Sequence, residues 1–132
     1  YIAKNTVKKI INTGKNIADT KVLVMGATFK ENVSDIRNSK VVDIVRELHS
    51  FNVEVVVVDP LASSKHMKQE YGIELSEDIG SGYDGIILAV NHREYADFDE
   101  EFFREIGAKN VVLFDVKGIY RDKIKSINYM SL

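Results

Sequence analysis

A loop rich in charged and polar residues lies at 27–38, between a predicted strand and a predicted helix. Lysine supplies a point charge and arginine a planar fork of donors, so the cations of such a loop can bind phosphate or sugar groups. The alternative is a solvated loop in which acidic and basic groups balance. Spacing alone leaves both interpretations open for the polar residues of this loop, which are Lys30, Glu31, Asn32, Asp35, Arg37 and Asn38.

A second polar loop follows the apolar run at 84–90 and carries Asn91, His92, Arg93 and Tyr95. In open parallel sheets, ligands bind beyond the carboxyl ends of the strands, where the strand order reverses. If the run at 21–26 neighbours the run at 84–90, the two loops flank one crevice. We therefore predict that Asn91 and His92 line it, and whether His92 contacts a ligand or only shapes the loop stays open.

Asp59 ends a predicted strand at the place where a dinucleotide fold binds a ribose hydroxyl, but Asp-Pro is also a turn former, and we favour the turn. After Gly26 the loop has no second or third glycine, unlike a dinucleotide fingerprint. The carboxylates of Asp35, Asp43 and Asp115 form no convincing acid–base pair, and we predict no catalytic residue here. His49 and His66 lack a histidine at helical spacing, so we predict no metal site.

The elements that position these loops follow from periodicity. Residues 2–18 predict an amphipathic helix that either packs on its own domain or links it to an upstream domain. A second helix begins with Asn38 or Ser39 as N-cap. Further helices are expected from Ser63 or Ser64 to Tyr71, near Glu77 as a short piece, and near 99–106. Continuous apolar runs predict strands at 21–26, 53–60, 84–90 and 111–116. This alternation indicates an α/β fold: a Rossmann-like, doubly wound three-layer sandwich with a mostly parallel sheet, preceded by a helix.

The composition of the chain excludes several classes of function. The chain has 132 residues, 45% of them hydrophobic, a net charge of −2 and no cysteine. One soluble domain is expected, with no basic field for nucleic acid or a membrane surface and no disulfide or cysteine nucleophile. No secretory or membrane-spanning pattern is present, so we expect a cytoplasmic protein. Because the chain starts at Tyr1 inside a helix, we expect a piece of a longer protein, with a tag-cleaved domain as the alternative.

The segment GATFKENVSDIRNSKVVDIVREL, followed by VEVVVVDP, resembles the C-terminal domain of the UDP-glucose/GDP-mannose dehydrogenase family, with its pattern GxxFKxxxxDxRxS. The resemblance continues through LAVNHREY and LFDVKGIY and covers nearly all of residues 20–120. The segments FKEN and DIRNS resemble those of bacterial enzymes that act on UDP-N-acetylhexosamines, including the Vi-antigen type. By this resemblance, residues 1–19 are the end of the central linker helix and residues 20–132 the nucleotide-sugar-binding domain.

The resemblance implies two-step oxidation of a nucleotide sugar's C6 alcohol to a carboxylate, in polysaccharide precursor synthesis. NAD is the cofactor, bound mainly by an N-terminal domain, and the reaction passes through a thiohemiacetal and a thioester on a cysteine outside these residues. Phe29 and Lys30 match positions at the UDP-sugar, and Arg37 matches an arginine that reaches toward NAD. Lys117 falls where many members have a basic residue at the substrate. The fragment alone is expected to be inactive.

Two other functions are known for α/β domains of this length. A stand-alone α/β nucleotide-binding regulatory module stays open, and the sequence upstream of Tyr1 would distinguish it. A phospho-receiver domain is excluded, because Met25, Gly26 and Ala27 stand where receivers need an acidic pair. The family's usual homodimer forms through its central helical region, so the full-length chain is expected to be a homodimer and this piece a monomer. Which sugar is oxidised, the order of the edge strands, and whether the piece binds nucleotide alone stay open.

Overall fold

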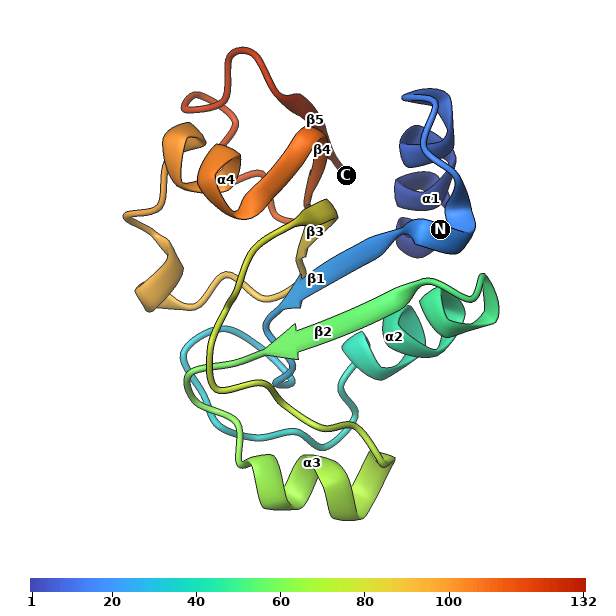
Figure 1. Cartoon of the computed structure of the whole chain (residues 1–132). Helices are drawn as coiled ribbons and strands as arrows, with labels where there is room; N and C mark the ends of the chain where they lie inside the picture. Colours follow the sequence, from blue (N-terminus) through green and yellow to red (C-terminus); the bar gives the residue numbers. More distant parts are fainter.

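The computed structural model describes all residues, 1–132, and contains one five-stranded parallel sheet of order β2-β1-β3-β4-β5 (Figure 1). The predicted neighbours β1 and β3 are confirmed as a parallel pair. All residues of β3 are buried, as its apolar sequence predicts for a strand covered on both faces. The strands are β1 (Lys21–Met25), β2 (Glu54–Val58), β3 (Tyr83–Leu88), β4 (Gly107–Asp115) and β5 (Asn128–Ser131).

Helices cover both faces of the sheet, which makes the predicted three layers (Figure 1). Successive side chains of β1 point to opposite faces. Val22 and Val24 pack with residues of α1 and α2, whereas Leu23 and Met25 pack with α4. The α/β, Rossmann-like fold is confirmed. The helices are α1 (Ile2–Asn12), α2 (Val41–Ser50), α3 (Ser64–Tyr71) and α4 (Glu100–Ile106), with short 3-10 turns η1 (Ile17–Asp19) and η2 (Arg93–Tyr95).

The first helix is part of this core. Ala3, Val7 and Ile10 are almost fully buried in the cluster that includes strand residues of β1 and β4. Burying three such side chains contributes several kcal/mol, at about 1.5–3 kcal/mol for each large one. The helix ends at Asn12, earlier than the predicted residue 18, and Gly14 follows with φ of 93°. The assignment of residues 1–19 to the end of a linker stays a prediction.

Two local predictions were wrong. The short helix near Glu77 is absent, and that segment instead covers the edge of β2, since Leu75 bridges Val57 and the Ser76 amide donates to the Val57 carbonyl at 2.8 Å. The α2 N-cap position is Lys40 rather than Asn38 or Ser39. No helix of the chain has both the length and the hydropathy needed to cross a bilayer.

Ser39 joins α2 to the sheet instead of capping the helix. Its hydroxyl donates to the Ala27 carbonyl at 2.8 Å and accepts the Val41 amide at 3.2 Å. Strand β5 was not predicted at all. Its four residues are only half-buried at the sheet edge and have no long apolar run. The helix at Ser64–Tyr71 was predicted correctly, with the Ser63 hydroxyl accepting the His66 amide as N-cap.

Candidate functional site

The ends of β1, β2 and β3 meet tightly at the carboxyl edge of the sheet. The Gly26 amide donates to the Val58 carbonyl at 2.8 Å, and the amides of Ala89 and Val90 both donate to the Met25 carbonyl. Gly26 has φ of 98°, in the region that favours glycine. The three following loops therefore start from one point, and this is the strand-order reversal at which ligands bind in such sheets.

Asp59 lies at the centre of these loops with no exposed side-chain surface. Its Oδ2 accepts the Ala27 amide at 2.6 Å and the His92 Nε2–H at 2.8 Å. Its Oδ1 accepts the amides of Leu61 and Ala62 at 2.7 and 2.9 Å. These bonds occupy the carboxylate from all sides. Asp59 is therefore a turn-forming residue here and presents no oxygen to a ribose.

The pKa of Asp59 lies below the ordinary aspartate value. Burial alone raises it, but the hydrogen bonds from His92, Ala27, Leu61 and Ala62 together outweigh burial and lower it. As the pH falls, the Asp59 carboxylate is therefore protonated at a higher pH in the unfolded chain than in the folded chain. Its contribution to folding stability is complete above about pH 4, the ordinary aspartate pKa, and is lost as the pH falls toward the folded-state pKa.

We expect a matching pH dependence in unfolding experiments. Urea titrations of the wild type and Asp59→Ala should show a large difference in unfolding free energy at pH 6, because the carboxylate is charged and bonded only in the wild type. Below about pH 4 that difference should shrink. A difference that stays constant down to about pH 2.5 would contradict the lowered pKa.

His92 is completely buried beside Asp59, and both of its ring nitrogens are occupied. Nδ1 accepts the Asn32 amide at 3.0 Å, so Nε2 carries the proton. Thr28 Oγ1 lies 3.2 Å from the same Nε2 that contacts Asp59. A Ser/Thr–His–Asp relay needs the two partners on different nitrogens, so these residues do not form a nucleophilic triad. His92 lies in the predicted crevice, but as the buried support of its loops, and Asn91 beside it is half-buried.

Phe29 and Lys30 project from the loop that this network holds. Phe29 is 53% exposed, an uncommon state for a phenylalanine, and Lys30 is also exposed. The Thr28 hydroxyl donates to the Lys30 carbonyl at 2.8 Å, and the Phe29 amide donates to the Asp35 carbonyl at 2.6 Å. Two consecutive exposed residues, one with an apolar ring and one with an ammonium group, therefore lie on a backbone segment that is held by two hydrogen bonds.

Arg37 lies further along the same loop, with its side chain 85% exposed. Its Nε and Nη2 atoms donate to the two oxygens of Asp35 at 3.0 and 2.9 Å. The hydrogen bonds from Arg37 lower the pKa of Asp35 to about 2, and the same pair raises the pKa of Arg37. The fork is thereby oriented while Nη1, which donates to no protein group, stays open to an anionic ligand.

Lys117 is exposed two residues after β4 ends, also at the carboxyl edge. The turn that carries it is built on buried Asp115, which accepts the amides of Gly118 and Tyr120 at 3.0 and 2.8 Å. Asp115 also accepts the Tyr129 hydroxyl at 2.7 Å, and burial together with that bond raises the pKa of Tyr129. Sequence reasoning treated Asp115 only as a poor catalytic candidate and missed this role.

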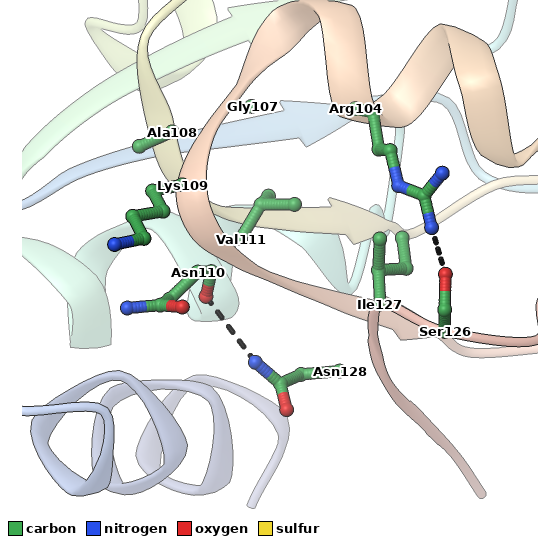
Figure 2. A pocket seen from close by; sticks show the side chains of 9 residues that line it. All are labelled: Arg104, Gly107, Ala108, Lys109, Asn110, Val111, Ser126, Ile127 and Asn128. Atoms are coloured by element: carbon green, nitrogen blue, oxygen red, sulfur yellow. Dashed lines mark hydrogen bonds between the residues drawn. The ribbon is translucent and has the colours of Figure 1, made fainter.

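A polar cavity of about 450 Å³ lies at the opposite edge of the sheet, where β4 and β5 begin (Figure 2). Arg104 Nη2 points at Ser126 Oγ, and Asn128 Nδ2 donates to the Asn110 carbonyl at 3.3 Å (Figure 2). None of the predicted site residues lines it. The chain also has no cluster of three or more side chains that could hold a metal ion. The candidate site is therefore the set of exposed groups at the carboxyl edge: Phe29, Lys30, Arg37 and Lys117.

Known proteins resemble this chain closely. It is 43% identical over 118 residues to "UDP-N-acetyl-D-glucosamine 6-dehydrogenase" of Pseudomonas aeruginosa. The match covers 89% of this chain and 28% of that protein. It is 38% identical, with the same coverage, to the protein of the same name from Salmonella typhi. The chain thus spans just over a quarter of the length of these relatives.

A solved structure has the same fold. The "NDP-N-acetyl-D-galactosaminuronic acid dehydrogenase from Methanosarcina mazei Go1" superposes with a TM-score of 0.84 at 20% identity, over 99% of this chain and 28% of that one. Residues 23–122 match the sequence profile described as "UDP-glucose/GDP-mannose dehydrogenase family, UDP binding domain". The match covers most of the chain and includes every exposed group of the candidate site. The chain therefore belongs to the UDP-glucose/GDP-mannose dehydrogenase family, through its UDP binding domain.

Proposed function

We propose that this chain is the UDP-sugar-binding part of an NAD-dependent nucleotide-sugar 6-dehydrogenase. The observation that carries the proposal is the pairing of exposed Phe29 with exposed Lys30 on a loop fixed at the strand-order reversal. Bound nucleotide presents a flat apolar ring and a charged diphosphate, and this pair matches both. The family membership of residues 23–122 supports the same ligand class.

Each exposed group has a task that fits its chemistry. Lys30 offsets the negative charge of the diphosphate, and Lys117 adds a second positive charge from the turn after β4. Phe29 covers a ring face of the ligand and removes its own apolar surface from water. These interactions grow stronger when a closing cleft expels water. The chain thus binds and orients the sugar donor.

NAD would accept the hydride in such an enzyme, and this chain offers it one group. The Nη1 of Arg37 is free on an exposed guanidinium whose orientation Asp35 fixes, which fits a pyrophosphate or a ribose. The chain contains no cysteine and no glycine-rich dinucleotide turn. The oxidation therefore needs groups from outside these 132 residues, and the chain alone should show no dehydrogenase activity.

The class of sugar is proposed from the relatives. Two proteins at 43% and 38% identity carry the name UDP-N-acetyl-D-glucosamine 6-dehydrogenase. We infer a UDP-N-acetylhexosamine as the substrate of the whole enzyme.

The test is a titration with UDP, monitored by backbone amide NMR signals. UDP should shift the signals of residues 27–40, and Lys30→Ala should weaken binding by about ten- to a hundredfold, since one charge-assisted contact is lost. Lys8→Ala is the matched control, because Lys8 is also an exposed lysine and lies on α1. Shifts confined to the polar cavity around Asn110, or equal effects of both variants, would contradict the proposed site.

A further inference from the structure

His92 lies directly beneath the loop that presents Lys30. Resting on the proposed function, we propose that His92 is a positioning residue that fixes the backbone at Lys30 and two residues after it, and so presents the Lys30 ammonium group to the diphosphate. The imidazole touches no ligand in this role. It acts through the position of the loop.

The tautomer of His92 gives the network a direction. Nδ1 accepts the Asn32 amide, so the proton stands on Nε2, between Asp59 Oδ2 at 2.8 Å and Thr28 Oγ1 at 3.2 Å. The hydroxyl hydrogen of Thr28 is already given to the Lys30 carbonyl at 2.8 Å. A lone pair of Thr28 therefore faces His92. The chain of donors runs from His92 through Thr28 to the Lys30 carbonyl.

The same imidazole also holds the backbone two residues after Lys30. It binds the Asn32 amide through Nδ1, and only Glu31 separates the two held positions. Asn32 has φ of 61°, which asparagine tolerates, and its carboxamide oxygen accepts the Arg93 amide at 2.7 Å. Residues 30–32 are thus joined to residues 92–93 by two direct hydrogen bonds and by one link through the Thr28 hydroxyl. A fixed backbone leaves less freedom to lose when a ligand binds, which favours affinity.

Burial excludes a direct role for the imidazole. Its exposed fraction is 0%, and no ring nitrogen is free for a ligand. The titratable groups that face it are Asp59 from the β2 loop and Tyr95 from η2, whose ring centroid lies 5.8 Å away. A ligand at the edge can therefore sense His92 only through the position of the loop.

The first experiment needs no ligand. In the 132-residue chain, His92→Gln keeps a donor toward Asp59 and Thr28 but removes the acceptor of the Asn32 amide. The hydrogen-exchange rate of the Asn32 amide should rise about tenfold, which corresponds to the loss of one net hydrogen bond. The buried amides of Leu23 and Ile87 should stay protected. His92→Asn places an oxygen near the former Nδ1 and should restore protection, and His66→Gln, at an exposed histidine, should change nothing.

A long-range ¹H–¹⁵N spectrum of the wild type should show an unprotonated Nδ1 and a protonated Nε2 at His92. Faster exchange across all strands in His92→Gln would overturn the inference, because it would mean general destabilisation. The opposite tautomer would overturn it as well, since Nδ1 could then not accept the Asn32 amide.

The second experiment is a double-mutant cycle with UDP. His92→Gln should weaken UDP binding about tenfold in the wild-type background and less than about twofold when Lys30→Ala is already present. Equal losses in both backgrounds would overturn the inference. Thr28→Val, which removes only the hydroxyl link to the Lys30 carbonyl, should show the same coupling and serves if His92→Gln does not fold.

The two proposals fail in different ways. If the wild type binds no UDP while the exchange and tautomer results hold, the proposed function is wrong and the loop is still held by His92. If UDP binds at residues 27–40 and Lys30→Ala weakens it, but His92→Gln does not, then only the positioning role is wrong.

Discussion

Replacing Asp59 with alanine should lower the unfolding free energy by about 2–5 kcal/mol, because several buried or half-buried donors lose a charged acceptor. The carboxylate accepts four hydrogen bonds and has no exposed surface. Its loss leaves the fully buried Ala27 amide without an acceptor, at about 1–3 kcal/mol, and His92 Nε2–H keeps only the more distant Thr28 Oγ1 at 3.2 Å. Urea unfolding followed by circular dichroism measures the effect.

Asparagine at position 59 should not rescue stability. With its oxygen toward Leu61 and Ala62, the amino group faces the Ala27 amide; with the amide flipped, it faces the amides of Leu61 and Ala62. Moving the His92 proton from Nε2 to Nδ1 would give the asparagine at position 59 an acceptor, but the Nδ1–H donor would then face the donating Asn32 amide. Every arrangement therefore sets donor against donor.

The matched control for both Asp59 variants is Asp122→Ala, an exposed aspartate with no hydrogen bond through its side chain. Its unfolding free energy should change by less than about 0.5 kcal/mol. An Asp59→Asn variant as stable as the wild type would show that the Asp59 carboxylate is not bonded from all four directions.

The sequence predicted the central strands because they are continuous apolar runs bounded by polar loops. The runs at 21–26 and 84–90 correspond to β1 and β3, and their pairing followed from the strand order usual in this fold class. β5 was not predicted because an edge strand of four half-buried residues needs no apolar run. The helix expected near Glu77 failed because those residues instead follow the edge of β2, a tertiary contact that local patterns do not contain.

The candidate site was predicted unevenly for a related reason. The exposed groups of the 27–38 loop are informative by type, and the motif that contains Phe29, Lys30 and Arg37 marked them. The support beneath them depends on partners distant in the chain, since His92 bonds Thr28 and Asp59 across 64 and 33 positions. A histidine after a strand looks the same in sequence whether it faces a ligand or a buried carboxylate. Only the assembled loops distinguish the two.

Replacing Gly26 with alanine is the second change with a large expected effect. Gly26 lies where the ends of β1, β2 and β3 converge, with φ of 98°. A Cβ atom there would stand 2.6 Å from the Val90 Cβ and 2.8 Å from the Val90 amide nitrogen. Backbone strain of about 1–3 kcal/mol therefore adds to an overpacking cost of about 1–3 kcal/mol. The unfolding free energy should fall by about 2–6 kcal/mol.

Gly14→Ala separates the two causes. Gly14 has nearly the same φ, 93°, but an added Cβ would meet no atom within 4 Å. That variant should show the strain alone, about 1–3 kcal/mol, so the excess in Gly26→Ala measures how closely β1 and the β3 loop approach. Because Val90 precedes the loop of His92, the NMR signals of residues 91–95 should also move in Gly26→Ala and stay in place in Gly14→Ala. Equal destabilisation by the two variants would mean that Gly26 and Val90 lie further apart than the 2.6 Å approach of the added Cβ implies. The loops that follow β1 and β3 would then not be held close together, as the site requires.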